Sequence, residues 1–461
     1  MNIKNIPCSF RDPSGFLFLE DNILYRQVNG SYKEDYDYLM SSGLYKALTD
    51  AGLLIPHEEA DRKHIGSDKA YKVIRPEKIP FISYPYEWCF SQLKEAALAT
   101  LKIQKISLQF GMSLKDCSAY NMQFIENKPV LIDTLSFEKY RDKEPWAPYR
   151  QFCQHFLAPL ALMSYKDVRL NQLLRIYIDG VPLDLASSLL PFYTFLNFPI
   201  LSHIHLHSKS QKYFSDKTIK MKQYSMSRLS LLGLIDSLES IVGKLRWQVK
   251  QSEWIDYYED TNYSLEALEQ KKEIVSAFLD EVKPGVVWDL GGNIGLFSRI
   301  AGNKGIYSIS FDMDPCVIEK SYKECLKNRE KNILPLIIDL TNPSPSIGWE
   351  NKERMSLIER GPVDLALALA LVHHLAIGNN LPFSKIAEFF SNICKALIIE
   401  FIPKSDSQVQ RLLSSREDIF LDYTKEHFEG EFRKYFDIEN SVKIKSSERV
   451  LYLMTKLGPK T

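Results

Sequence analysis

The chain reads Val286-Val287-Trp288-Asp289-Leu290-Gly291-Gly292-Asn293-Ile294-Gly295-Leu296-Phe297-Ser298 over the stretch that decides its fold. A short apolar run ends beside an acid, three glycines follow within five positions, and an apolar pattern of helical spacing begins after them. This order predicts a parallel strand, a tight turn and a helix, the unit that holds a nucleotide-like ligand at the edge of a sheet. Glycine suits such a turn because the missing Cβ permits a positive φ and lets a ligand approach the backbone closely.

A second predicted strand narrows the kind of ligand. Residues 306–312 read as a strand that ends at Asp312, about twenty residues beyond the glycines, the distance at which one strand and one helix deliver an acid to a ribose. The glycines read Gly-Gly-Asn-Ile-Gly soon after Asp289, which differs from the Gly-x-Gly-x-x-Gly of dinucleotide-binding proteins. The sequence therefore predicts a ligand that has a ribose but no pyrophosphate.

Together these features resemble the class I S-adenosylmethionine-dependent methyltransferases, whose first motif is an acid followed by a glycine-rich turn. Three further segments fit the third, fourth and fifth strands of that family in the right order: residues 336–340, 363–371 and 396–401. The resemblance covers about residues 250 to 456 and implies an α/β domain of Rossmann-like type with a seven-stranded sheet. For the glycine turn alone, the alternative is an ordinary connection between a strand and a helix.

The resemblance implies S-adenosyl-L-methionine as the cofactor. Asp289 would lie near its amino-acid end, Asp312 would receive the ribose hydroxyls, and Asp339 would meet the edge of the adenine. The implied cofactor-binding residues are Tyr263, Asp289, Gly291, Gly292, Asn293, Gly295, Asp312, Met313, Asp339 and Leu340. Tyr263 belongs to an aromatic segment that either closes over the cofactor or only staples the following helix. A single acid at a strand end is more commonly a cap, whereas three at successive strand ends favour a ligand.

Two histidines follow the predicted fourth strand, where this family presents groups to the substrate. His374 is the candidate catalytic base, because an imidazole titrates near neutral pH and can accept a proton from a hydroxyl or an amine. The alternative is that His373 and His374 are structural. Neither Asn-Pro-Pro-Tyr nor a cysteine follows this strand, which argues against the N6-adenine, glutamine and cytosine-C5 subtypes. Glu400 ends the fifth strand and is expected to be structural.

The first third of the chain predicts a mixed α+β domain. Residues 15–20 and 22–28 read as a hairpin with Asp21 at its turn. A helical stretch follows at about 36–51, two strands bounded by prolines are expected at 71–74 and 81–83, and residues 87–110 show the apolar spacing of a helix.

Asp116, Asn121 and Asp133 form a second pattern with a chemical meaning. An acid, an amide five positions later and another acid after a hairpin resemble the arrangement in kinase-like phosphotransferases. In those families the first acid orients the acceptor hydroxyl, and the amide and the second acid hold magnesium. This chain lacks a His-Arg pair before Asp116 and a glycine-rich loop upstream, and Lys72 is the candidate for the nucleotide-anchoring lysine. The alternative is that Asp116 and Asn121 satisfy backbone groups in a loop.

Composition limits the class of protein. The 461 residues, 45% of them hydrophobic, predict a globular chain of two or three domains. Lys plus Arg and Asp plus Glu are 58 each, so no global basic field draws the chain to nucleic acid. Seven cysteines without C-x-x-C spacing form a poor disulfide framework, and the first residues lack the apolar core of a secretory leader. A cytoplasmic location is therefore expected.

Two features of the middle of the chain have competing interpretations. Residues 185–206 contain no charged side chain and are long enough to span a bilayer. Pro191 and Pro199 interrupt them, so buried helical packing or a lid against a partner domain is expected rather than a membrane span. His203, His205 and His207 alternate as metal ligands on a strand would, but no acid or cysteine cluster accompanies them, so no metal site is expected.

These observations predict three parts: an α+β domain at 1–145, a mainly helical extension with a linker at 146–245, and a methyltransferase domain at 246–461. The linker itself is expected between residues 237 and 253. The predicted function is S-adenosylmethionine-dependent methyl transfer to an unknown acceptor, with small molecules or glycans favoured and the N-terminal domain recognising the acceptor or regulating the enzyme. The alternative is a kinase-like phosphotransferase whose C-terminal domain senses a cofactor. The sequence does not define an oligomeric state.

Overall fold

A computed structural model describes residues 3–60, 69–207, 225–248, 264–414 and 416–458. The chain forms two compact units. The first comprises residues 1–248 together with 346–354, and the second comprises residues 249–345 and 355–461. The predicted division of the chain at 145 and 245 stays a prediction.

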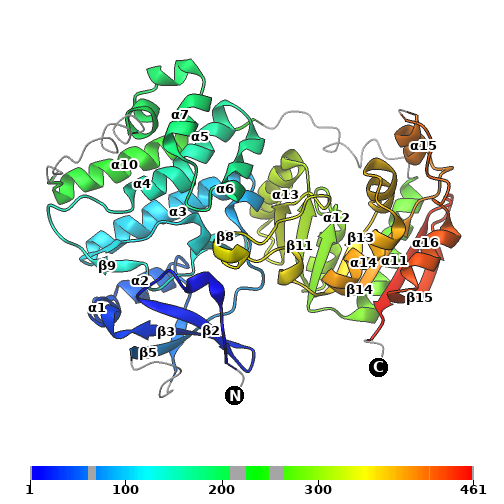
Figure 1. Cartoon of the computed structure of the whole chain (residues 1–461), viewed down its shortest axis with the longest axis horizontal. Coiled ribbons are helices and arrows are strands. Elements are labelled where there is room, and N and C mark those ends of the chain that lie inside the picture. The colour runs from blue at the N-terminus through cyan, green and yellow to red at the C-terminus, as the bar shows by residue number, and fades with distance from the viewer. Residues whose placement is uncertain (1–2, 61–68, 208–224, 249–263, 415, 459–461) are drawn as a thin grey trace. The chain divides into compact units, whose positions relative to one another are not determined.

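The second unit is built on a seven-stranded sheet with the order β12, β11, β10, β13, β14, β16, β15 (Figure 1). β10 to β14 pair in parallel, and β16 is antiparallel to both of its neighbours. This is the strand order of the class I methyltransferases, so the predicted Rossmann-like domain is confirmed. The strands are β10 (Val286–Leu290), β11 (Tyr307–Asp312), β12 (Ile333–Ile337), β13 (Val363–Ala368), β14 (Cys394–Phe401), β15 (Phe436–Lys443) and β16 (Val450–Lys456).

Helices cover both faces of this sheet, because its strands are apolar on both sides. On one face, Leu365 and Leu367 of β13 join an apolar cluster with Phe278 of α11 and Leu451 and Leu453 of β16. Tyr452 of β16 points to the opposite face, as the alternation of a strand requires, and its ring lies 5.4 Å from that of Phe428 in α16. The helices are α11 (Leu265–Val282), α12 (Leu296–Asn303), α13 (Pro315–Asn328), α14 (Phe383–Ile393), α15 (Ser407–Leu413) and α16 (Lys425–Phe432).

The third predicted strand is displaced. We expected it at 336–340, but β12 ends at Ile337, so Asp339 lies two residues beyond the strand in the following loop. The apolar run continues through Ile338, whose N–H donates to the carbonyl of Asp312 at 2.9 Å, and hydrophobicity therefore gives no signal for the end of the strand.

The first unit contains a five-stranded antiparallel sheet with the order β1, β2, β3, β5, β4. The predicted hairpin is confirmed, with Glu20 opposite Ile23. The predicted strand at 81–83 is wrong: β5 instead pairs with β3 and β4. The elements are β1 (Ile3–Asn5), β2 (Gly15–Glu20), β3 (Ile23–Asn29), α1 (Lys33–Ser41), α2 (Leu44–Asp50), β4 (His57–Glu59), β5 (Ala70–Pro76) and α3 (Phe90–Gln109).

Two small hairpin-like sheets follow α3 and carry the second sequence pattern. β6 (Met112–Leu114) pairs with β9 (Phe137–Lys139), and β7 (Met122–Ile125) pairs with β8 (Lys128–Leu131). Asp116 and Asn121 lie between β6 and β7, and Asp133 lies between β8 and β9. A five-stranded sheet, a long helix and these two pairs resemble the kinase-like phosphotransferases in arrangement.

The rest of the first unit is mainly helical, as predicted. The linker expected at 237–253 is wrong in its first part, because α10 continues to Lys244 with Ile241 and Val242 buried. Residues 249–253 of that prediction lie outside the described residues. The helices are α4 (Tyr149–Phe152), α5 (Ala158–Tyr165), α6 (Leu173–Ile176), α7 (Leu183–Leu189), α8 (Phe198–Ile200) and α10 (Arg228–Lys244), with 3-10 turns at Val168–Gln172 and Phe192–Leu196 and π-helical turns at Cys153–Leu157 and Leu201–Leu206.

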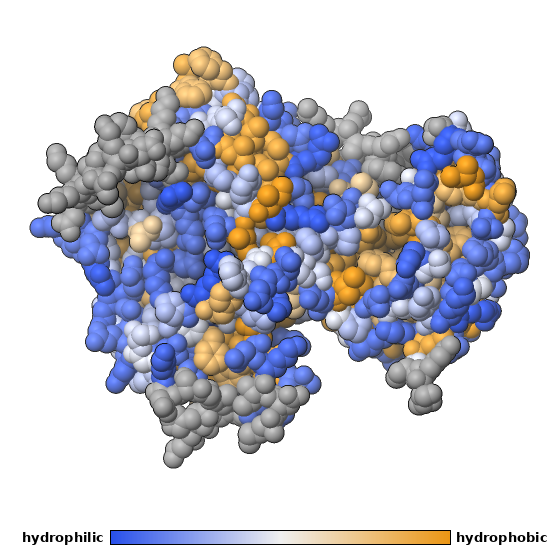
Figure 2. Space-filling model, in the orientation of Figure 1, coloured by the Kyte–Doolittle hydropathy of each residue, from blue (hydrophilic) through white to orange (hydrophobic). Residues whose placement is uncertain are grey.

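The uncharged segment at 185–206 forms several short elements. Within the described ranges, no helix has both the length and the apolar character that a membrane crossing requires. Pro191 precedes the turn Phe192–Leu196, and Pro199 lies in the first turn of α8. Phe192, Leu196 and Phe198 are 85%, 88% and 76% exposed, and Figure 2 shows hydrophobic surface over the part of the first unit that contains α7. Ile200 and Ile204 are fully buried, so the expected helical packing holds for part of the segment only, and the alternative of a lid stays a prediction.

Leu365→Ala tests the centre of the second unit. Leu365 is fully buried in the parallel pair of β10 and β13, so we expect the free energy of unfolding of this unit to fall by about 2 to 5 kcal/mol in a urea titration. Leu326→Ala, at a position on α13 that is 42% exposed, is the matched control and is expected to change it by less than about 0.5 kcal/mol. Equal effects of the two substitutions would contradict this placement of β13.

Candidate functional site

A cavity of about 200 Å³ lies at the C-terminal edge of the parallel strands in the second unit. The structure brings most of the predicted site residues to its wall: Asp289, Gly291, Gly292, Asn293, Asp312, Met313, Asp339, Leu340 and His374. Gly295 is not among the lining residues, and Tyr263 lies outside the described part of the chain. One cavity is therefore lined by Asp289 and Asp312, at the ends of β10 and β11, and by Asp339, in the loop beyond β12.

The glycine-rich turn is shaped by its backbone. Gly291 and Asn293 adopt φ values of 73° and 51°, and the N–H groups of Gly291 and Gly292 both donate to the carbonyl of Phe311 at 2.9 Å. A Cβ on Gly292 would lie 2.5 Å from Ser310 Oγ and 2.9 Å from Asp289 Oδ2, so glycine is required there by close packing. Gly295, with φ 86°, immediately precedes α12 and shapes the turn without lining the cavity.

Asp312 is fixed by two backbone donors. Its Oδ2 accepts from the N–H of Asn293 and its Oδ1 from the N–H of Asp314, both at 3.0 Å. Burial raises the pKa of Asp312 to about 6, against the opposing effect of these hydrogen bonds. A carboxylate has about four lone-pair positions, so the group can also accept two hydroxyl donors from a ligand in the cavity.

Asp289 is 2% exposed and lies on the same wall. Ser298 Oγ of α12 donates to its Oδ2 at 2.7 Å. Burial raises the pKa of Asp289 to about 6, while the hydrogen bonds from Ser298 and the nearby charge of Lys271 act in the opposite direction. A buried carboxyl of this kind gains most from a ligand that brings a cation or several donors.

Asp339 and His374 complete the predicted set. Asp339 Oδ1 accepts from the N–H and the hydroxyl of Thr341, at 2.8 and 2.7 Å, which fixes the loop beyond β12. Burial lowers the pKa of His374 to about 4, so its imidazole is neutral at pH 7 and is a weak proton acceptor. His373 is 2% exposed, and its ring centroid lies 4.1 Å from that of His374.

Sequence reasoning missed Lys271 of α11, which also lines the cavity and is 3% exposed. Its Nζ donates to Glu400 Oε2 of β14 at 2.7 Å, and the backbone N–H of Ala370 donates to the same oxygen at 2.7 Å. A signal was present in the sequence, because Lys271 interrupts the apolar stripe formed by Ala267, Val275 and Phe278 of the same helix. A lysine in such a stripe must have a buried partner.

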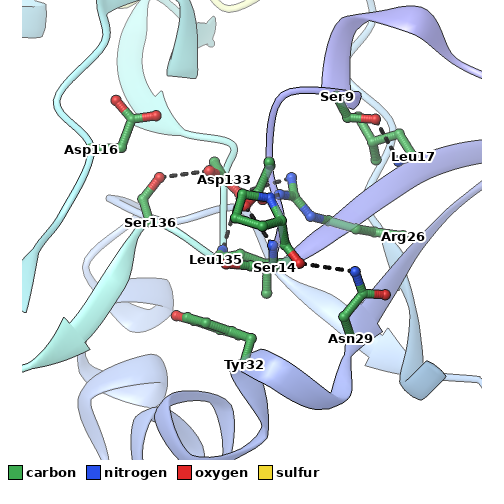
Figure 3. A network of polar contacts seen from close by, with 12 residues as sticks. Ser9, Ser14, Leu17, Arg26, Asn29, Tyr32, Asp116, Asp133, Leu135 and Ser136 are labelled. Carbon is green, nitrogen blue, oxygen red and sulfur yellow. Dashed lines mark hydrogen bonds and ion pairs between the residues drawn. The ribbon is translucent and has the colours of Figure 1, made fainter. Parts of the chain in front are cut away.

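Asp133 of the second pattern belongs to a polar network in the first unit, and Asp116 is drawn near it in Figure 3. Arg26 of β3 is 8% exposed and contacts two acids, with Nη1 2.8 Å from Asp133 Oδ1 and Nη2 2.6 Å from Asp12 Oδ2. Asp133 also accepts from the N–H of Leu135 at 3.0 Å and from Ser136 Oγ at 2.6 Å. Both oxygens of Asp133 therefore have protein donors.

Asp116 also accepts hydrogen bonds from protein groups at both of its oxygens. Its Oδ1 accepts from the N–H of Ser118 at 2.9 Å and from Gln151 Nε2 at 2.7 Å, and its Oδ2 accepts from Asn121 Nδ2 at 2.9 Å. Burial and then the charge of Asp133 raise the pKa of Asp116. The candidate Lys72 lies on β5, where it pairs with Glu59 at 2.6 Å, whereas the cation beside Asp133 is Arg26.

The magnesium that a kinase-like fold implies does not fit this arrangement. Both oxygens of Asp133 accept hydrogen bonds from protein groups, and Arg26 already supplies the positive charge beside this carboxylate. Across the described residues, no group of three or more His, Cys, Asp or Glu side chains is placed to hold a metal ion. Asp116 accepts from the backbone N–H of Ser118, as the alternative of loop-backbone hydrogen bonding predicts, whereas the Asn121 side chain donates to Asp116.

Two of the alternating histidines, His203 and His205, are hydrogen-bonded to side chains through both ring nitrogens. His203 contacts Tyr149 Oη at 2.7 Å and Ser237 Oγ at 3.0 Å, and His205 contacts Ser187 Oγ at 2.7 Å and Thr194 Oγ1 at 2.9 Å. These residues lie on a π-helical turn rather than on the strand that we considered.

Comparison with known proteins gives one extensive similarity. No family model matches the chain. The nodulation protein NoeA of Rhizobium meliloti (strain 1021) is 34% identical over 453 residues, which cover 96% of this chain and 94% of that protein.

Solved structures match about half of the chain. The crystal structure of WbdD matches with a TM-score of 0.31 and 16% identity, over 47% of this chain and 46% of that one. Another matched structure is that of WbdD under the description bifunctional kinase-methyltransferase. The magnesium protoporphyrin IX methyltransferase (ChlM) of Synechocystis PCC 6803 with bound SAH matches with a TM-score of 0.32 and 17% identity, over 44% of this chain and 93% of that one. We assign the fold of the second unit from its own strand order.

Arg26→Met tests the polar network around Asp133 in the first unit. The substitution leaves Asp12 and Asp133 without their shared buried cation, so we expect the free energy of unfolding to fall by about 3 kcal/mol in a urea titration. Arg75→Met is the control, because its pair with Glu58 is solvent-exposed, and it is expected to cost less than about 1 kcal/mol. If Arg26→Met were as mild as Arg75→Met, the network would not be the stabilising feature described.

Proposed function

The chain belongs to the family of the nodulation protein NoeA, and we propose that it transfers a methyl group from S-adenosylmethionine to an acceptor molecule. One observation carries the proposal: Asp289, Asp312 and Asp339, from three successive strand-and-loop units, line a single cavity at the C-terminal edge of a class I methyltransferase sheet. Each acid alone has a structural interpretation, but their convergence beside a glycine-rich turn favours an adenosyl ligand.

The wall of the cavity matches the parts of that cofactor in order. Asp312 offers fixed acceptor oxygens to two ribose hydroxyls, and the neighbouring Met313 offers apolar surface to the adenine. Asp339 and Leu340 lie on the loop that would meet the adenine edge, and Asp289 faces the ammonium of the amino-acid end. When bound, the cofactor supplies an activated methyl group, so the protein has mainly to hold and orient the two reactants.

The proposal also covers the position and the chemical class of the acceptor. We place it beside His374, which follows β13 and lines the same cavity. A neutral imidazole can receive the proton of a hydroxyl or an amine, although the lowered pKa of His374 makes it a weak base that suits an acceptor with an acidic proton. A small molecule or a glycan remains our preferred acceptor, with the first unit recognising it and the protein acting in the cytoplasm.

Phosphotransfer is not our preferred activity. The carboxylates of Asp116 and Asp133, which it would require, are occupied by Arg26, Asn121 and Gln151 in the structure. The observed contacts of these two carboxylates are all with protein groups, and none of them indicates a nucleotide site.

Asp312→Ala tests the cofactor site. We expect S-adenosylhomocysteine to bind the wild-type protein in isothermal titration calorimetry and to bind the variant at least about 30-fold more weakly, because about 2 kcal/mol of hydrogen bonding to a charged group is lost. Asp280→Ala, at an exposed position on α11, is the control and should bind normally. Failure of the wild-type protein to bind this ligand would refute the proposal.

Transfer itself is tested with S-adenosylmethionine that carries a radiolabelled methyl group. Incubated with fractionated cell extract, the wild-type protein is expected to label one fraction, and Asp312→Ala is expected to lose that label. Label in the small-molecule or glycan fraction would support the preferred acceptor, whereas label in protein or nucleic acid would overturn that part of the proposal.

Ligand affinity is also expected to depend on pH. Burial raises the pKa of both Asp289 and Asp312 to about 6, so both become protonated as the pH falls below that value. A ligand that donates to the ionised groups should then bind up to about tenfold more weakly per pH unit for each carboxylate, and its affinity should be constant from pH 7 to 8. Calorimetry with S-adenosylhomocysteine between pH 5 and 8 measures this, and a flat profile would show that neither group binds in its ionised form.

A further inference from the structure

We propose that Lys271 binds the carboxylate of the cofactor's amino-acid moiety, and that the protein thereby distinguishes the complete cofactor from adenosyl compounds that lack this moiety. The inference rests on the proposed function and adds a charged contact that no motif predicted. It follows from where Lys271 lies, what holds it, and which charges surround it.

Lys271 lies at the amino-acid end of the cavity. It contributes to the same wall as Asp289 and Leu268, and its Nζ lies 5.1 Å from the ring centroid of Phe297, which follows the glycine-rich turn. The residue is 3% exposed, so a bound group would meet its charge with little screening by water. The acids assigned to the ribose and the adenine, Asp312 and Asp339, belong to β11 and the loop beyond β12.

Glu400 fixes the ammonium group of Lys271. Glu400 is fully buried in β14, and its Oε2 accepts from both Lys271 Nζ and the N–H of Ala370 at 2.7 Å. Ala370 adopts a φ of 50°, an uncommon value for a residue with a Cβ, and this turn after β13 also lines the cavity. An ammonium group has three donors, so it can serve Glu400 and a ligand carboxylate together.

Lys271 belongs to a buried group of charges in which Glu400 also has a second cation beside it. Arg449 is 1% exposed, its Nη1 lies 3.9 Å from Glu400 Oε1, and it also pairs with Asp406 at 2.7 Å. Lys271 and Arg449 together balance Glu400 and Asp406. Asp289 lines the same cavity wall as Lys271 and is close enough for the two charges to interact. An acid and a cation on one wall are complementary to the ammonium and the carboxylate of an amino acid.

The competing interpretation is that Lys271 only ties α11 to β14. A purely structural lysine would affect all ligands of the cavity alike, because it would act through the shape of the site. A carboxylate-binding lysine affects only ligands that have the carboxylate. Two compounds separate these cases: S-adenosylhomocysteine, and 5′-methylthioadenosine, which retains the adenosine and the thioether but has no amino-acid moiety.

The experiment is isothermal titration of the full-length wild-type protein and Lys271→Met with both compounds. We expect Lys271→Met to weaken S-adenosylhomocysteine by about 10-fold to 100-fold, the usual effect of losing a hydrogen bond between charged groups, and to change 5′-methylthioadenosine by less than about threefold. Lys272→Met is the matched control on the next position of α11, where the side chain pairs with Glu269 at the surface, and it should leave both affinities unchanged.

Lys271→Met leaves Glu400 without one of its buried partners and risks misfolding. The double variant Lys271→Met/Glu400→Gln removes both charges while the glutamine oxygen can still accept from Ala370, and normal binding of 5′-methylthioadenosine shows that the site is intact. Equal weakening of both compounds in a folded variant would overturn the inference in favour of the structural role, and so would no weakening of either. Failure of the wild-type protein to bind either compound would instead refute the proposed function itself.

Discussion

The parallel direction of five neighbouring strands is the constraint on which the site depends. β10 to β14 all end at the same edge of the sheet, so residues up to 111 positions apart in sequence, from Asp289 to Glu400, reach one region without any contact between them being encoded locally. The packing of α11 and α12 against β13 and β16 holds this edge in place. The cavity is therefore a consequence of sheet topology, and the glycine-rich turn determines how closely a ligand can approach it.

Sequence patterns predicted this part of the fold well because the local and the global signals agree there. β10 is an apolar run that ends at an acid and glycines, and its observed limits, Val286–Leu290, match the run. The predicted and observed elements differ where hydrophobicity continues past the end of an element, as at Ile338 beyond β12. They also differ at 81–83, where flanking prolines suggested a strand that the sheet does not contain. The linker was placed too early because α10 buries Ile241 and Val242, which a composition rich in Lys and Arg conceals.

The site itself was predictable only as far as short motifs reach. Asp289, Asp312 and the glycines belong to adjacent elements, so their spacing carries the information. The pair of Lys271 and Glu400 joins residues 129 positions apart, and the bridge from Arg26 to Asp133 joins β3 to the loop before β9. No local pattern specifies such long-range pairs. The bridge from Arg26 to Asp133 also changes the predicted chemistry of the site. The pattern formed by Asp116, Asn121 and Asp133 by itself indicates a metal site, but Arg26 lies where the metal would bind Asp133.

The two networks show how the placement of a cation separates a structural acid from one available to a ligand. Asp133 has Arg26 and two further protein donors, so its charge and both of its oxygens have partners within the first unit. Asp289 is 2% exposed and has Ser298 as a hydrogen-bond donor, and burial raises its pKa from 3.8 to about 6. That difference corresponds to about 3 kcal/mol by which burial disfavours the ionised form. A ligand that brings an ammonium group to this position removes that penalty on binding, so the cost of burying Asp289 in the free protein becomes selectivity for a cationic partner. The presence or absence of a protein cation paired with the acid, rather than the acid's place in a motif, therefore distinguishes the cavity of the second unit from the network around Asp133 in the first unit.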